Sequence, residues 1–288
     1  MLDILCIGHI TRDCIITPQQ TVYLPGGTSW YAANALIALN KDNDTPVSFE
    51  LLTAMAPEDM APVEELRAQG ITVTCLPSER TLFFENRYGT DFNSRQQRVL
   101  ATAAPFTIEQ LGQVSAKYII LGSLLANDVP IEAFQLLHQR GCLVVDVQGF
   151  LREVRGETVH AIDWAQKREA LRYVDVLKVN ESEMEIITRM SDPRRAAMRL
   201  AEWGVREVLL TFGSNGSLIY DAQHHRFHDI PAVMPRQVVD ATGCGDTYVL
   251  GYVYRRSQGA SIVDAALYAA AVSARKLEAS GPLTSIEL

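Results

Sequence analysis

Asp240-Ala241-Thr242-Gly243-Cys244-Gly245-Asp246 is the stretch of sequence that indicates most about the fold. It follows the strand-like residues 237–239 and opens an apolar segment at Thr247 that has the spacing of a helix. Two glycines let the backbone turn its amide groups toward one point, where the following helix adds the positive end of its dipole. A strand, a glycine-rich turn and a helix in this order predict an anion-binding loop in an α/β fold.

Asp246 stands where this loop meets the expected helix. A carboxylate is otherwise a poor neighbour for a phosphate, so its position fits a proton acceptor beside a transferring phosphoryl group. An aspartate that caps a helix after a glycine-rich turn would look the same. The loop alone does not separate the two interpretations.

The rest of the chain alternates strand-like and helix-like segments, the order that builds a parallel sheet covered by helices. We predict strands at 3–7, 47–52, 118–122, 143–147, 174–179 and 208–212, a hairpin at 217–220 and 225–227, and helices at 29–39, before Gly70, after Pro130, at 181–190, 194–203, 247–256 and 261–277. Residues 12–25 and about 72–102 break the alternation with short β-branched and aromatic runs. We expect them to form a small β lid on a single domain that spans 1–288.

Composition limits the classes of function. The net charge of −8 argues against non-specific binding to nucleic acid or to anionic membranes, because both require basic surface. The five cysteines are scattered and odd in number, the N-terminus has no basic leader, and no apolar run is long enough to span a membrane. We therefore expect a cytoplasmic protein with reduced thiols, and neither nucleic acid nor membrane as a partner.

Three motifs in this order resemble the ribokinase or PfkB family of carbohydrate kinases: Gly26-Gly27, Asn180-x-x-Glu183 and the loop 240–246. Together they span nearly the whole chain. The resemblance implies a ribokinase-like three-layer αβα sandwich with a mostly parallel central sheet and a β lid over the acceptor site. It also implies ATP and Mg²⁺ as cofactors.

The same resemblance implies that Asp246 is the catalytic base and that the backbone at Gly243, Cys244 and Gly245 forms the anion hole. Cys244 stands where the family usually has alanine. A thiol at a helix N-terminus can be reactive, but we expect this small side chain to point away from the phosphate.

For the donor, the resemblance implies that Asn180 and Glu183 serve the magnesium and phosphate end, with Glu183 as the metal ligand. Magnesium prefers oxygen ligands and keeps several of its waters. Without the resemblance, this segment reads as an ordinary capped helix start. Further donor contacts are expected from the loop, from a strand-to-turn segment, and from small residues of the last helix: Thr242; Thr211, Gly213 and Gly216; Ala269, Ala270, Ala271 and Ala274.

At the acceptor end, Asp13 and Asp128 correspond to carboxylates that bind substrate in the family, and Gly26 and Gly27 would let a sugar approach the backbone. Tyr31 is a departure, because many family members have a sugar-binding asparagine there. It argues against ribose- or fructose-type recognition.

Residues 146–152 are similar to an Asp-x-Gln-Gly-x-x-Arg segment of the inositol-kinase branch. The similarity implies that Gln148 reaches the acceptor and that Arg152 reaches the triphosphate. A strand end followed by a polar turn is the simpler alternative.

The sequence thus predicts ATP-dependent phosphorylation of a hydroxyl group on a sugar or polyol, with an inositol-like acceptor as one form of it. A nucleoside kinase is an alternative, since Trp30, Tyr31 and Phe84 could stack on a base. A sugar-binding protein that has lost catalysis is another. An unpaired edge of the lid is expected to pair with a second copy as a homodimer.

Overall fold

The computed structural model describes residues 1–41, 43–88 and 95–286. In this part of the chain, the larger sheet has nine strands in the order β15-β14-β13-β12-β9-β8-β1-β4-β5. The pairs from β13 to β5 are parallel, and β14 and β15 add an antiparallel hairpin at one edge. The strands are β1 (Ile4–Ile7), β4 (Phe49–Met55), β5 (Thr72–Pro77), β8 (Tyr118–Leu121), β9 (Cys142–Asp146), β12 (Val176–Asn180), β13 (Glu207–Thr211), β14 (Ser217–Asp221) and β15 (Arg226–Ile230).

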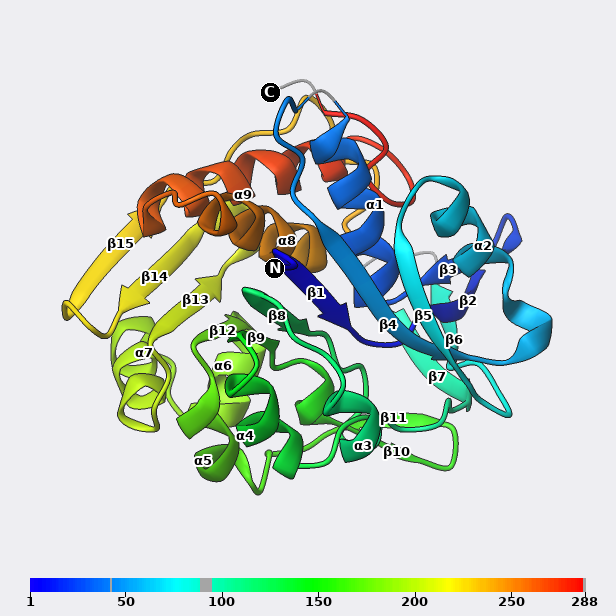
Figure 1. Cartoon of the computed structure of the whole chain (residues 1–288), viewed down its shortest axis with the longest axis horizontal. Helices are drawn as coiled ribbons and strands as arrows, with labels where there is room; N and C mark the ends of the chain where they lie inside the picture. The colour runs from blue at the N-terminus through cyan, green and yellow to red at the C-terminus, as the bar shows by residue number, and fades with distance from the viewer. Residues whose placement is uncertain (42, 89–94, 287–288) are drawn as a thin grey trace.

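Helices cover both faces of this sheet (Figure 1). One layer contains α1 (Thr28–Asn40), α2 (Ala61–Ala68), α8 (Cys244–Ser257) and α9 (Ile262–Leu277); the other contains α3 (Ile108–Leu111), α4 (Glu132–His138), α5 (Lys167–Ala170), α6 (Glu181–Thr188) and α7 (Pro193–Glu202). Successive side chains of a strand point to opposite faces. In β1, Ile4 and Cys6 therefore join the core under α1, α8 and α9, whereas Leu5 and Ile7 join the core on the other side. The predicted three-layer αβα sandwich is confirmed.

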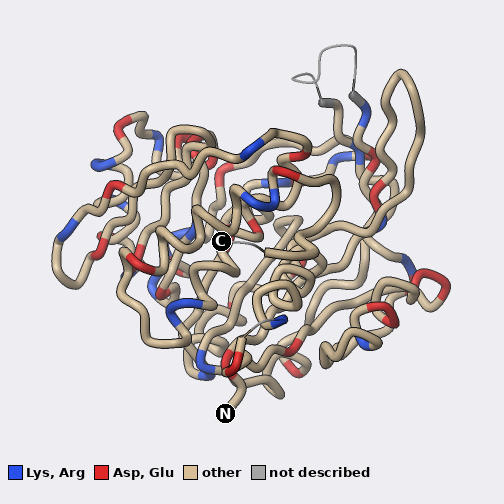
Figure 2. Tube along the Cα trace, turned by 90° about the horizontal axis from the view of Figure 1, so that it is seen from above, with Lys and Arg blue, Asp and Glu red and all other residues tan. Residues whose placement is uncertain are grey.

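Acidic and basic residues are interspersed along the trace (Figure 2). Among the described residues, no helix has both the length and the apolar character needed to cross a membrane.

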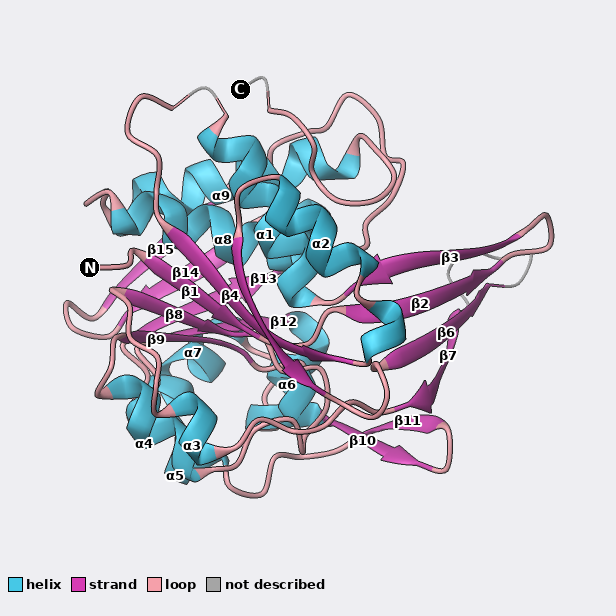
Figure 3. Ribbon diagram, turned by 45° about the vertical axis from the view of Figure 1, so that its right-hand side comes forward, coloured by secondary structure: helices cyan, strands magenta, loops and turns pink. Residues whose placement is uncertain are grey.

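A smaller sheet projects from one end of the sandwich (Figure 3). Its order is β10-β11-β7-β6-β2-β3. The strands are β2 (Thr11–Ile16), β3 (Thr21–Gly26), β6 (Phe83–Tyr88), β7 (Arg95–Ala101), β10 (Arg152–Arg155) and β11 (Thr158–Ala161). Residues 12–25 thus lie in β2 and β3 and the turn between them.

Three differences between the prediction and the structure go beyond the end residues of an element. The segment 72–102 begins with β5, which pairs with β4 in the large sheet; its residues 89–94 lie outside the described residues. The hairpin of β10 and β11 extends the smaller sheet and was not predicted, because its strands are only four residues long and β10 is rich in charge. Residues 237–239 are not a strand: the amide of Val239 donates to the carbonyl of Leu277 at the end of α9.

Candidate active site

A cleft of ≈ 1830 Å³ is lined by residues of the smaller sheet and by residues at the carboxyl ends of the central parallel strands, among them Asp146, Asn180 and Thr211. Ligands of open α/β sheets bind outside these strand ends. One end of the cleft, where the sequence predicts the acceptor, is lined from the smaller sheet by Asp13, Phe84 and Asn86; the other end, where the sequence predicts the donor, lies beside α9 at Ala270 and Ser273. We call them the acceptor end and the donor end. Its volume exceeds that of a typical single-ligand pocket, so two small substrates fit.

The predicted anion-binding loop forms the middle of this cleft. Gly243 is the N-cap of α8 and has φ of 76°, a left-handed conformation that favours glycine. A side chain at this position would also collide with the ring of Tyr31. The amide of Cys244 donates to the carbonyl of Ala241 at 3.2 Å, and the amides of Gly245 and Asp246 belong to the first helical turn, which has no intrahelical acceptors for them. These amides can bind an anion.

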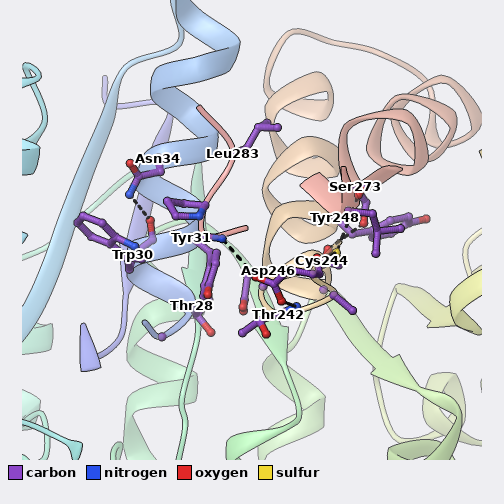
Figure 4. Close-up of a pocket in the computed structure, with 18 of the residues that line it drawn as sticks. Thr28, Trp30, Tyr31, Asn34, Thr242, Cys244, Asp246, Tyr248, Ser273 and Leu283 are labelled. Atoms are coloured by element: carbon purple, nitrogen blue, oxygen red, sulfur yellow. Dashed lines mark hydrogen bonds between the residues drawn. The ribbon is translucent and has the colours of Figure 1, made fainter. Parts of the chain in front are cut away.

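Asp246 lies at the start of α8, facing Thr28 and Tyr31 of α1 (Figure 4). Burial raises the pKa of Asp246 to about 6, and the negative charge of Asp146 acts in the same direction. A hydrogen bond from the Thr28 hydroxyl and the positive charges of Lys178 and Arg152 oppose the increase. A carboxylate with this pKa is ionised at neutral pH and is a stronger base than an exposed aspartate.

Lys178 is a buried cation directly beneath the loop. Its Nζ lies 3.0 Å from Asp146 Oδ2 and 3.8 Å from Glu183 Oε2, and a Cβ on Gly245 would be 3.3 Å from it. Burial alone would lower the pKa of Lys178, but the two carboxylates outweigh it and raise the pKa above its ordinary value. The ammonium group is therefore charged, and it faces the site where the loop would hold a phosphate.

The Asn180 and Glu183 motif is a capping box at the start of α6. Glu183 Oε2 accepts from the Asn180 amide at 2.8 Å, and Asn180 Oδ1 accepts from the Glu183 amide at 2.9 Å. Asn180 lines the cleft, whereas Glu183 lies behind it and is 6% exposed. Burial raises the pKa of Glu183. The motif thus stabilises the helix start and brings one amide side chain to the cleft.

The carboxylates of Asp146 and Glu183 do not form a direct magnesium site, because Lys178 lies between them. The described residues contain no group of three or more His, Cys, Asp or Glu side chains that could hold a metal ion. A magnesium ion that arrives on donor phosphates with its own waters is compatible with the cleft. Glu183, for which the sequence predicts a role at the magnesium either directly or through water, has its Oε2 3.8 Å from Lys178 Nζ.

Comparison with known proteins gives the family. Residues 72–288 match the model of the pfkB family carbohydrate kinases. The chain belongs to this family. The cytidine kinase of Thermococcus kodakarensis is 27% identical over 273 residues, which cover 90% of each protein.

Two solved structures show the same ribokinase-like fold. A pyrophosphate-dependent kinase of the ribokinase family, solved with a pyrophosphate analogue and myo-inositol, has a TM-score of 0.83 at 26% identity over 97% of both chains. The ribokinase of Arabidopsis thaliana, solved with ribose and ATP, has a TM-score of 0.75 at 18% identity over 98% of this chain and 95% of that one. The protein is therefore a kinase of the ribokinase family, of the carbohydrate or nucleoside type.

The paired glycines of this kinase give space to neighbouring groups. A Cβ on Gly26 would be 2.5 Å from Asp13 Oδ2, and one on Gly27, which has φ of 86°, would overlap the carbonyl of His9. Gly27 and Asp13 line the cleft, but Gly26 does not. Gly26 thus makes room for the Asp13 carboxylate, which also accepts from the Thr11 hydroxyl at 2.7 Å.

Of Tyr31 and Asp128, which the sequence predicts at the acceptor, only Tyr31 lines the cleft. Tyr31 borders the cleft but is only 7% exposed, because its ring packs against Gly243 and supports the loop. Asp128 does not line the cleft: its Oδ2 accepts from the amides of Leu124 and Leu125 and holds a turn. Burial raises the pKa of Asp128, but the nearby His9, whose Nδ1 lies 3.5 Å from Oδ2, and these amides lower it overall.

Gln148 and Arg152 both line the cleft, as the inositol-kinase similarity implies. The backbone amide of Gln148 donates to Asp146 Oδ1 at 3.0 Å, and the residue lies before the short turn at Gly149–Leu151. Arg152 begins β10, so the segment joins the large sheet to the smaller one.

The donor end contains the predicted strand-to-turn residues Thr211, Gly213 and Gly216, together with Thr242. From α9, Ala270 and Ala274 line the cleft, whereas Ala269 and Ala271 do not. The segment that precedes the loop adds apolar side chains that are open to solvent: Val233 (37% exposed), Met234 (80%), Val238 (73%) and Val239 (51%).

Cys244 points away from the phosphate position. Its Sγ lies 4.0 Å from the carbonyl of Asp240 and 3.9 Å from that of Ser273 on α9. Burial raises its pKa to about 11, so the thiol is neutral and a poor nucleophile at physiological pH.

Proposed function

We propose that this kinase transfers the terminal phosphate of ATP to a hydroxyl group of a sugar or polyol, with Asp246 as the general base. The observation that supports it is the position of Asp246, with a pKa of about 6, at the first turn of a helix whose amides face the middle of the cleft. Asp246 accepts the hydroxyl proton while the hydroxyl oxygen bonds to the terminal phosphorus. The bond from that phosphorus to the bridging oxygen breaks, and ADP leaves with the electron pair.

The residues around the transferred phosphate act through charge. The amides of Gly245 and Asp246 and the ammonium of Lys178 stabilise the negative oxygens, while Arg152 faces the phosphates from the smaller sheet. Such preorganised donors are usually the largest contribution to a rate of phosphoryl transfer. Magnesium, when it is bound to ATP, would neutralise donor phosphate charge.

For the acceptor, polarity favours a polyol over a nucleoside. Asp13, Asn86, Gln97 and Gln148 line this end of the cleft and offer donors and acceptors to several hydroxyl groups. Trp30 and Phe84 are each 4% exposed, so they present little ring surface to a base. The relative solved with myo-inositol supports the same choice.

A nucleoside acceptor is the second candidate, because the cytidine kinase of T. kodakarensis matches 90% of the chain. The test is kcat/KM for ATP consumption with inositols, pentoses, hexoses and nucleosides. A polyol or sugar should give the highest value. A nucleoside at the top of the series would replace our proposal, and binding without turnover of any acceptor would indicate a protein that has lost catalysis.

For the donor, the exposed apolar segment 233–239 favours ATP over pyrophosphate. A nucleotide base can cover Met234 and Val238, whereas pyrophosphate has no apolar part that would do so. The related pyrophosphate-dependent kinase makes the comparison necessary. Assays with each donor at matched magnesium should show turnover with ATP; turnover with pyrophosphate alone would reject this part of the proposal.

We also propose that the smaller sheet is the lid over the acceptor and pairs with a second copy. Its edge strand β3 exposes Tyr23 (56%) and Leu24 (38%), and unpaired edges with apolar side chains favour association. Light scattering should give a dimer for the natural protein and a monomer for Leu24→Lys.

The five cysteines all lie in the described part of the chain and are free. Their free state supports a reducing, cytoplasmic compartment, as we propose.

A further inference from the structure

Lys276 is a second buried cation, located behind the anion-binding loop. It lies in the last turn of α9 and is 1% exposed. Its Nζ donates to three oxygens: the Asp240 carbonyl at 2.9 Å, Asp240 Oδ2 at 3.2 Å and the Ala279 carbonyl at 3.5 Å. A buried ammonium group is stable only with such partners.

These oxygens belong to two segments that the cation joins. Asp240 is the first residue of the loop, and its Oδ1 accepts from the Thr242 amide at 2.9 Å. Its Oδ2 also accepts from the amide of Gly281 at 3.2 Å, in the segment after α9 that lines the donor end of the cleft. Burial raises the pKa of Asp240, but the hydrogen bonds from Thr242 and the charge of Lys276 lower it overall.

Tyr31 of α1 contacts the same loop. The ring of Tyr31 packs against Gly243, and its centroid lies 6.0 Å from Lys276 Nζ. The loop is thus in contact with both an aromatic ring and a buried positive charge, and Lys276 itself does not line the cleft. Lys276 is a positioning residue for the loop.

We propose that Lys276 is a built-in cation, whose ammonium group takes the place that a free K⁺ or NH₄⁺ ion would otherwise occupy among these oxygens. One carboxylate oxygen and two carbonyl oxygens suit an alkali cation as well as they suit an ammonium group. The enzyme should therefore need no added monovalent cation, and removal of the side chain should create that need. The kinetic part of this inference rests on the proposed function.

The experiment compares the natural protein with Lys276→Ala in buffers whose only monovalent cation is tetramethylammonium, which is too large to enter. Lys276→Ala should lose about 10²-fold in kcat/KM, because displacement of a catalytic group by about 1 Å has an effect of that size. NH₄⁺ and K⁺ should restore most of it. The kcat/KM of the natural protein should not change when these ions are added.

Lys167→Ala is the matched control. Lys167 Nζ also contacts one carboxylate and one carbonyl, Asp163 Oδ1 at 2.6 Å and Ile187 O at 2.8 Å, but it lies away from the cleft. Its activity should not respond to NH₄⁺ or K⁺. Lys276→Gln, whose amide can donate to the same oxygens, should be less sensitive to cations than Lys276→Ala.

Thermal unfolding separates this inference from the proposed reaction. The midpoint of Lys276→Ala should rise when NH₄⁺ or K⁺ replaces tetramethylammonium, whether or not an acceptor has been found. An unchanged midpoint and an activity loss that no cation restores would overturn the inference. An increase in kcat/KM of the natural protein on addition of K⁺ would also overturn the inference. This measurement does not depend on whether a variant folds.

Discussion

The ring of Tyr31 lies against the backbone of Gly243, so that α1 and the anion-binding loop are in direct contact at this glycine. Gly243 also has φ of 76°. Two independent constraints, the ring and the backbone conformation, thus exclude a side chain at this position. The aromatic residue that departs from the usual asparagine of the family therefore has a structural role beside this loop.

Gly243→Ala should reduce both stability and activity. The left-handed backbone costs about 1–2 kcal/mol with a Cβ, and the collision with Tyr31 displaces the loop as well. Gly259→Ala is the control, because Gly259 has φ of 85° but no neighbouring atom within 4 Å. Urea unfolding and kcat/KM of the two variants check this. Equal stability losses and equal activity would show that Tyr31 does not press on the loop.

Asp246→Asn should nearly abolish turnover and yet stabilise the fold at neutral pH. Loss of a general base typically costs about 10²–10⁴ in rate. Because the pKa of Asp246 is raised from 3.8 to about 6, the folded protein binds the proton more tightly than the unfolded chain. Ionisation therefore destabilises the fold, with an effect that grows from pH 3.8 to about 6 and then stays constant.

Unfolding free energies at pH 4 and pH 8 test whether ionisation of Asp246 destabilises the fold. The stability advantage of Asp246→Asn over the natural protein should be larger at pH 8 than at pH 4. A variant that is active, or one that is less stable than the natural protein at pH 8, would contradict the assignment of Asp246 as a base with a raised pKa.

The pH dependence of kcat/KM should follow the same carboxylate. Activity should rise with pH through a midpoint of about 6, where Asp246 becomes ionised. Asp146→Asn removes a negative charge that raises this pKa, so the midpoint should move to lower pH; Thr28→Val removes a hydrogen bond to the carboxylate, so it should move to higher pH. Shifts in the same direction for both variants would exclude Asp246 as the titrating group.

Much of the architecture could be predicted from local patterns. The central strands are continuous apolar runs because both faces of the sheet are covered, and the capping box of Asn180 and Glu183 marks a helix start within four residues. The glycine-rich loop is equally local. These features depend on neighbours in the chain, so one sequence is enough to recognise them.

The partners of charged residues could not be predicted in this way. Lys178 meets Asp146 because β12 and β9 pair in parallel at this register, across about thirty intervening residues. The signal for Lys178 was a lysine inside the apolar strand 176–179, where an unpaired charge would be unstable. Asp128 was predicted to contact the acceptor, but its Oδ2 accepts from two amides that only the folded turn brings together.

Lys178→Met should destabilise the fold and weaken donor binding. Removal of one partner from a buried ion pair typically costs about 3–5 kcal/mol of unfolding free energy. Here the carboxylates of Asp146 and Glu183 would repel each other without the ammonium group. The double variant Lys178→Met with Asp146→Asn should recover part of the stability but not the KM for the donor. Chemical unfolding and donor titration measure the two effects. Full additivity of the two substitutions would show that the pair is not coupled.

The exposed apolar side chains of residues 233–239, before the loop, should contact the base of ATP. Met234 is 80% exposed at the donor end of the cleft, so a bound nucleotide base would cover its side chain. The substitution Met234→Ser would remove this apolar contact. We expect a several-fold higher KM for ATP with little change in kcat, since the contact is made equally in the ground state and the transition state. Met198→Ser on α7, where the methionine is 40% exposed and does not line the cleft, is the matched control and should leave KM unchanged. A KM for ATP that is the same in both variants would mean that the base binds elsewhere, and the choice of ATP over pyrophosphate would lose its structural support.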